Sequence, residues 1–205
     1  MEIKPSDLSP KEMHKLIIGC VVPRPIAWIC TVNAEGQTNL APFSFFNGVC
    51  ARPATLSVSF SYNPGRPDHK KDTLRNIEAN REFVVNVAAE PQQQTMHATS
   101  GDFDVDVSEI ERFGLTCVPS VCVQPPRILE SPIQFECSLR QAIPIGEGPG
   151  SATLVLGTIE QIHVHDRLID NALHIDAEAL KPIGRLAGDT YCYVHDIFDL
   201  GPRPR

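Results

Sequence analysis

Residues 39–60 read Asn39-Leu-Ala-Pro-Phe-Ser-Phe-Phe-Asn-Gly-Val-Cys-Ala-Arg-Pro-Ala-Thr-Leu-Ser-Val-Ser-Phe60 and have the most unusual composition in the chain. They hold four of its nine phenylalanines, with small and hydroxyl residues placed among the rings. A plain core strand is richer in Val and Ile, so this composition favours a wall against which a flat, partly polar molecule can lie. Taken alone, the stretch is equally consistent with two ordinary strands joined by a turn near Gly48.

Further strand-type segments flank this stretch. Residues 26–32 form an apolar run, and the polar residues 33–36 that follow it have the composition of a hairpin turn. We therefore expect residues 26–32 to pair antiparallel with the strand that begins at Thr38. Three more segments of strand type lie downstream, at residues 82–87, 133–139 and 152–165.

The arrangement of these segments predicts the fold class. About six or seven strands are joined by short hairpins, without the strand–helix alternation of a parallel sheet, so we expect a mainly β protein with peripheral helices, built as an antiparallel barrel or sandwich. One helix is expected over residues 10–19, because Ser9 and Glu12 form a capping box ahead of it. We expect a single domain over residues 1–205, with a surface excursion near residues 90–125 and a loose tail over residues 201–205.

Composition excludes several classes of function. A net charge of −7 argues against general nucleic-acid binding, which needs a concentrated basic surface. The chain lacks the long apolar run of a membrane span, and its first residues lack the pattern of a signal peptide. Its seven cysteines include no Cys-x-x-Cys pair, which indicates free thiols and a cytoplasmic location.

A cationic cluster of Arg66, Lys70 and Lys71 precedes a predicted short helix that Asp72 or Thr73 can cap. A helix N-terminus offers unpaired N–H groups and a partial positive charge, to which nearby cations add. The hydroxyl of Thr73 is a further donor, and a phosphate monoester is the ligand best suited to such a place. The alternative is that these cations are simply solvated.

Together, the aromatic stretch and the cationic cluster suit a flat ligand with an apolar body and a phosphate tail. Flavin mononucleotide (FMN) fits this description, because its ring buries apolar area while its edge needs hydrogen bonds from backbone and hydroxyl groups.

Several short motifs occur in an order that resembles the flavin reductase-like, FMN-binding split-barrel family. They extend from about residue 20 to 193 and comprise Arg24-Pro25-Ile26-Ala27-Trp28, residues 39–47, Arg52-Pro53, Lys71-Asp72-Thr73, residues 83–86, and Gly184-Arg185-Leu186 with Tyr191. The resemblance implies an antiparallel six-stranded split β-barrel of the FMN-binding type, a homodimer, and FMN bound near the subunit boundary.

The resemblance also implies roles for individual residues. The residues expected to line the isoalloxazine ring are Ala41, Pro42, Phe43, Ser44 and Phe45, with Ser44 as a hydrogen-bond partner for the polar edge. Those expected to hold the phosphate are Ser59, Arg66, Lys71 and Thr73, while Asp72 caps the helix. Arg185 is expected to approach the flavin or a nicotinamide substrate, with a plain surface salt bridge as the equal alternative. No role follows for Arg24.

The function implied is that of an oxidoreductase in which FMN accepts a hydride from NADH or NADPH and passes electrons to free flavin or another small molecule. No acid–base residue is singled out, because the flavin carries the redox chemistry. One alternative is an FMN-bearing electron carrier without its own NAD(P)H site. Another is a non-catalytic barrel that binds a different ligand.

Three further features have ordinary interpretations. His163 and His165 lie two apart on one strand face, but no third ligand is placed near them, so no metal site is expected. Cys50 lies beside the proposed flavin wall and is interpreted as a buried small hydrophobe. Trp28 is expected in the core.

Overall fold

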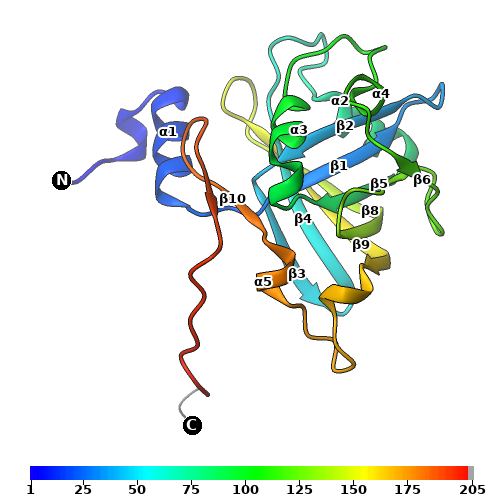
Figure 1. Ribbon diagram of the computed structural model, residues 1–205. Coiled ribbons are helices and arrows are strands. Elements are labelled where there is room, and N and C mark those ends of the chain that lie inside the picture. Colours follow the sequence, from blue (N-terminus) through cyan, green and yellow to red (C-terminus); the bar gives the residue numbers. More distant parts are fainter. Residues whose placement is uncertain (203–205) are drawn as a thin grey trace.

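A seven-stranded antiparallel sheet, in the order β2-β1-β5-β8-β9-β4-β3, forms the body of the protein in the computed structural model, which describes residues 1–202 (Figure 1). Its strands are β1 (Ala27–Val32), β2 (Thr38–Phe43), β3 (Phe46–Ala51), β4 (Ala54–Ser61), β5 (Glu82–Val87), β8 (Ile133–Ile145) and β9 (Ala152–Val164). The sheet curls so that its two ends come together. The ring of Phe43 at the end of β2 contacts that of Phe60 on β4, with the ring centroids 4.6 Å apart. The mainly β fold class and the expected pairing of β1 with β2 are confirmed.

The strand count corrects the expectation of six strands. Residues 39–60 contribute to three strands rather than two, and Gly48 lies within β3 instead of at a turn. The turn falls at Arg52-Pro53, where proline has no N–H to give to the ladder. Of the expected tail, residues 203–205 lie outside the described part of the chain.

Short helices and two small sheets surround the main sheet. The helices are η1 (Pro5–Asp7), α1 (Pro10–Cys20), α2 (Asp72–Asn80), η2 (Glu90–Gln92), α3 (Gln93–Ala98), α4 (Glu109–Arg112), η3 (Asp166–Leu168) and α5 (Ala177–Leu180). The small sheets pair β10 (Ile183–Arg185) with β11 (Tyr191–Tyr193) and β6 (Cys117–Val118) with β7 (Arg127–Ile128). Among residues 1–202, none of the helices is long and apolar enough to cross a membrane.

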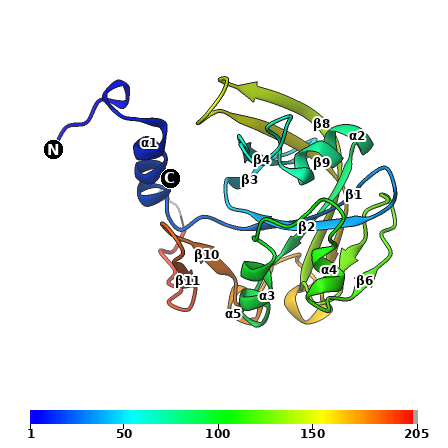
Figure 2. The ribbon, with the colours of Figure 1, turned by 90° about the horizontal axis from the view of Figure 1, so that it is seen from above.

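Helix α1 begins where the sequence predicts. The Ser9 hydroxyl accepts from the Glu12 N–H at 3.3 Å, and the Glu12 carboxylate accepts from the Ser9 N–H at 2.9 Å, so the capping box is confirmed. None of its residues is buried. Figure 2 shows α1 beside β10 and β11, apart from the strands of the barrel.

Helix α2 also lies where expected, but neither Asp72 nor Thr73 caps it. The N-cap position is Lys71, which makes no side-chain cap bond. The Asp72 carboxylate instead accepts from Arg66 at 2.7 Å and from Arg75 at 2.5 Å. Because its oxygens accept charge-assisted hydrogen bonds from two guanidinium groups, the Asp72 carboxylate does not accept from the N–H groups at the helix N-terminus.

Two groups of buried side chains cover the two faces of the sheet. One fills the barrel interior and includes Ile29, Phe60 and Phe83. The other lies outside β1 and β5, where Trp28 packs with Met96 of the excursion. Trp28 is fully buried, as expected, and its Nε1 donates to the Thr99 Oγ1 at 2.9 Å. The segment at residues 90–125 therefore covers a second core.

The barrel interior leaves no room for a side chain at Gly157 of β9. A Cβ atom built there would lie 2.4 Å from the Cζ of the buried Phe83. We expect Gly157→Ala to lower the free energy of unfolding by about 1–3 kcal/mol, the usual cost of overpacking, as measured by urea denaturation. The matched control is Gly48→Ala in β3, where a Cβ meets nothing within 4 Å. Equal unfolding midpoints for the two variants would contradict this packing.

Candidate functional site

The predicted site residues divide between two cavities that share Pro42, Phe43 and Lys71. The first, of about 110 Å³, also contains Ala41, Arg66 and Thr73. The second, of about 370 Å³, also contains Ser44, Phe45, Ser59 and Arg185. The structure therefore brings the aromatic wall together with only part of the expected phosphate site.

The wall of the second cavity is made by the end of β2 and the bend that follows it. Phe43 closes β2, and Ser44 and Phe45 form the bend before β3 begins. The backbone N–H of Ser59 on β4 donates to the Phe45 carbonyl at 2.8 Å, which holds this bend against the barrel. The wall thus consists of rings with a hydroxyl between them.

The lining of the second cavity includes hydroxyl groups and an ammonium group. Ser59 and Ser61 are two apart on β4 and so project to the same side of the strand. Lys71 lies with them among the residues that line the cavity. Its Nζ is 3.8 Å from Asp102, a carboxylate that is 90% exposed, so this ion pair is weak. These groups are suited to binding an anion.

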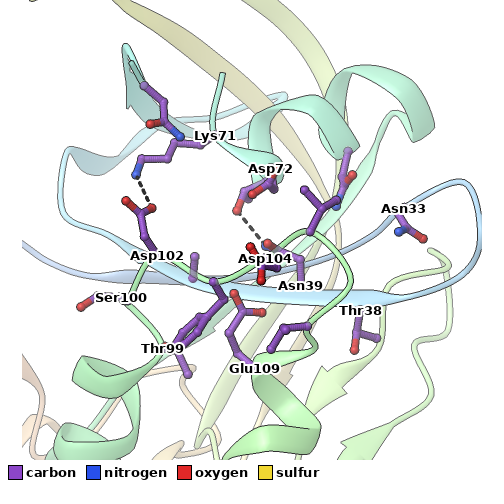
Figure 3. A pocket seen from close by; sticks show the side chains of 18 of the residues that line it. Asn33, Thr38, Asn39, Lys71, Asp72, Thr99, Ser100, Asp102, Asp104 and Glu109 are labelled. Atoms are coloured by element: carbon purple, nitrogen blue, oxygen red, sulfur yellow. Dashed lines mark hydrogen bonds and ion pairs between the residues drawn. The ribbon is translucent and has the colours of Figure 1, made fainter. Parts of the chain in front are cut away.

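The first cavity is acidic, and Arg66, one of its two cations, is already paired with a carboxylate. Figure 3 shows Asp72, Asp102, Asp104 and Glu109 around it, with Lys71 at one side. Arg66 donates to Asp72 at 2.7 Å, and this hydrogen bond raises the pKa of Arg66. An anion would meet four carboxylates here, so the first cavity is poorly suited to a phosphate.

Arg66 and Thr73 are engaged by the protein itself. Besides its bonds to Asp72, Arg66 donates to the Phe103 carbonyl at 2.9 Å. Thr73 is buried, and its hydroxyl accepts from the Asn39 side chain at 2.9 Å. Both contacts depend on segments far away in the sequence.

Glu109 is a buried carboxylate of the first cavity. It accepts a hydrogen bond from the Leu40 N–H at 2.8 Å, which ties α4 to β2. Burial raises the pKa of Glu109. In the sequence, Ser108-Glu109-Ile110-Glu111 has the pattern of a helix-capping box, which gives no sign of this cavity.

Arg24 is the residue of the second cavity that sequence reasoning left without a role. Its side chain is almost fully buried and donates to the carbonyls of Ile18, Val21 and Leu186 and to the hydroxyl of Ser44. Burial, and then the charge of Arg185, lowers the pKa of Arg24. The only sequence signal was the Arg24-Pro25 motif ahead of β1.

Arg185 lies in β10 at the same cavity. It donates to the hydroxyl of Tyr191 and to the carbonyl of Gly188, and its guanidinium lies 4.5 Å from the centre of the Tyr191 ring. Its only ion pair among the described residues is with the exposed Asp189, at 3.5 Å. Arg185 therefore lies in the lining of the second cavity and also forms an ion pair with an exposed carboxylate.

Charge distinguishes the second cavity from the first. Three cations face it, namely Arg24, Lys71 and Arg185. None of the described residues that line it is Asp or Glu. A cavity with aromatic walls and excess positive charge suits a flat anionic ligand.

Two of the remaining features singled out in the sequence are His163 and Cys50. His163 pairs with the buried Glu136 at 2.6 Å, and no group of three His, Cys, Asp or Glu side chains able to hold a metal ion occurs within residues 1–202. Cys50 is exposed, so its interpretation as a buried hydrophobe is wrong. It lies on β3, which is an edge strand.

The sequence model of the flavin reductase like domain matches residues 18–183, which include every residue that lines the first cavity and most of those that line the second. The chain belongs to the flavin reductase-like family. Membership in this family supports a flavin-related oxidoreductase and confirms the resemblance seen in the sequence motifs.

Solved structures agree with this membership. Nitrilotriacetate monooxygenase component B from Bacillus cereus is 36% identical, with a TM-score of 0.92 and coverage of 98% of each chain. The 2-nitrobenzoate 2-nitroreductase NbaA from Pseudomonas fluorescens is 33% identical, with a TM-score of 0.87 and coverage of 99% of this chain and 96% of that one. A protein named as a flavin reductase with a split barrel domain, from Shewanella frigidimarina, has a TM-score of 0.82 at 21% identity and covers 99% of this chain and 100% of that one, which supports the split-barrel fold.

Proposed function

We propose that the protein is an FMN-binding oxidoreductase that takes electrons from NADH or NADPH. The observation that carries this proposal is the second cavity, where an aromatic wall, four serine hydroxyls and three cations occur without a carboxylate among the described lining residues. Its volume of about 370 Å³ is within the range of ligand-binding pockets. The donor set therefore fits a flavin with a phosphate tail.

The lining residues of this cavity have two separate tasks in the proposal. Phe43, Ser44 and Phe45 bind and orient the ring, while Ser59 and Lys71 bind the phosphate. The remaining predicted residues, Ala41, Pro42, Arg66 and Thr73, shape the wall or hold the loop that carries Lys71. Arg185 is proposed to contact the flavin or the nicotinamide substrate.

The bound flavin would supply the redox chemistry by accepting a hydride and passing electrons to a small-molecule acceptor. The protein's own residues orient the ring, exclude water with the rings of Phe43 and Phe45, and balance negative charge with their cations. Because hydride transfer requires no general base, the proposal assigns no acid–base role to a residue of this cavity.

We also propose that the protein is a cytoplasmic homodimer. The described cysteines are all free thiols, which suits a reducing compartment. Helix α1 buries none of its residues, and Ile17 on it and Val49 on the edge strand β3 are exposed. Apolar side chains of this kind on one chain favour a second copy as their partner.

An anaerobic reduction titration of the purified protein tests the proposed function. We expect FMN to bind and to be bleached rapidly by NADH or NADPH, as followed by absorbance. A protein that binds FMN but is bleached slowly or not at all would be an electron carrier. No binding, with an unchanged melting temperature in excess FMN, would contradict the proposal and favour a barrel for another ligand.

A further inference from the structure

Arg24 keeps a charged guanidinium in the protein interior without a carboxylate partner. Its relative exposure is 5%, and no ion pair to Arg24 occurs among the described residues. A buried charge of this kind is costly unless hydrogen bonds compensate it. The protein supplies four acceptors, and three of them are backbone carbonyls.

Those carbonyls come from two separate segments. Nη1 donates at 2.7 Å to both Ile18 and Val21, at the C-terminal end of α1. Nη2 donates at 2.9 Å to Leu186, directly after β10. Cations are favoured near the C-terminus of a helix, where free carbonyls lie. The guanidinium is therefore fixed from two sides.

The fourth acceptor is the hydroxyl of Ser44, which accepts from the Arg24 Nε at 3.3 Å. Within residues 1–202, no hydrogen bond is found in which Ser44 Oγ is the donor. A hydroxyl that accepts from a fixed N–H directs its own hydrogen away from that donor. Because Ser44 lines the second cavity, this hydrogen is available to a bound molecule.

We propose that Arg24 is a positioning residue that makes the Ser44 hydroxyl a hydrogen-bond donor to the bound flavin ring. This inference rests on the proposed function. A fixed donor interacts more strongly with the reduced ring, which is richer in electrons, than with the oxidised ring. Ser44 therefore raises the reduction potential of the bound flavin, and Arg24 acts through it.

The chemistry of arginine explains why no other cationic side chain could make these hydrogen bonds at position 24. Only a guanidinium has a planar fork of five N–H donors, which here reaches three carbonyls and one hydroxyl at once. Lysine keeps the positive charge but has no Nε–H to direct toward Ser44. Arg24→Lys therefore separates the effect of charge from the effect of hydroxyl orientation.

The test measures the reduction potential of bound FMN in the full-length protein, together with its affinity for oxidised FMN. In Ser44→Ala we expect the preference for reduced over oxidised FMN to fall about tenfold, which equals about 30 mV for a two-electron couple. Arg24→Lys should shift the potential in the same direction. Because the two residues act as a unit, the double variant should shift it no further than Ser44→Ala alone.

Ser57→Ala is the matched control, since Ser57 lies on β4 but does not line the second cavity. FMN bound to this variant should have the same reduction potential as FMN bound to the unchanged protein. If the unchanged protein binds no FMN, the proposed function is wrong, and this inference is wrong with it. If Ser44→Ala binds FMN with an unchanged potential, the inference is overturned, whether or not Arg24→Lys folds. A shift in Ser44→Ala with none in a folded Arg24→Lys would refute the role of Arg24.

Discussion

Lys71→Ala is expected to weaken FMN binding by about 10- to 100-fold, since hydrogen bonds to charged groups contribute about 1.5–3 kcal/mol. Lys71 lines both cavities, and its Nζ has only the exposed Asp102 at 3.8 Å as an ionic partner. Its charge is therefore available to a phosphate. Titration of FMN fluorescence with protein gives the dissociation constant directly.

The neighbouring lysine provides the control for this prediction. Lys70 carries the same charge one residue earlier, but it pairs with Glu78 at 2.5 Å and lines neither cavity. Lys70→Ala should leave the dissociation constant within about twofold. Equal affinities for the two variants would show that the phosphate does not bind at Lys71. The Lys71 effect should also shrink at high salt, because salt screens a partly exposed charge.

Glu136→Ala is expected to lower the free energy of unfolding by about 3–5 kcal/mol, the usual cost of removing one partner from a buried charged network. The carboxylate is fully buried on β8. It accepts from the backbone N–H groups of Val121 and Cys122 at 2.9 and 2.6 Å and from His163 at 2.6 Å. It thereby fixes the end of the excursion to the sheet.

Urea denaturation at pH 7 measures this effect. Glu160→Ala on β9 is the control, because among the described residues Glu160 bonds only to the hydroxyl of Ser138 on the protein surface. This substitution should lower the free energy of unfolding by no more than about 0.5 kcal/mol. Loss of comparable stability in both variants would contradict the role assigned to Glu136.

The pH dependence of stability follows from the same carboxylate. Burial by itself raises the pKa of Glu136, but hydrogen bonds from Val121, Cys122 and His163 outweigh it, so the pKa lies below its usual value. The stabilisation is therefore complete above the unfolded-state pKa of about 4.3 and is lost as the pH falls through the lower folded-state pKa. Glu136→Gln should reduce the loss of stability on acidification.

Local sequence patterns were sufficient to predict several of the helices and strands. The capping box at Ser9 and Glu12 predicted the start of α1, and the polar turn at residues 33–36 predicted the pairing of β1 with β2. The strand count failed at Gly48, because glycine favours turns locally but β4 holds it in a ladder through Leu56. Pairing partners distant in sequence overrode the local preference.

The sequence by itself determined the fold class, the family motifs and the presence of an aromatic wall near a cationic loop, because these depend on neighbouring residues and their spacing. The tertiary structure alone decided which cations face the ligand site. Arg66 and Lys71 look alike in sequence, but Asp72 and Phe103 hold Arg66, while Lys71 lies at the second cavity. Arg24 also lines that cavity, because the carbonyl of Ile18, before it in the sequence, and that of Leu186, far after it, accept hydrogen bonds from the same guanidinium. Hydrogen-bond partners that lie far apart in the chain meet only after folding, and they determine whether a charge is free to bind a ligand.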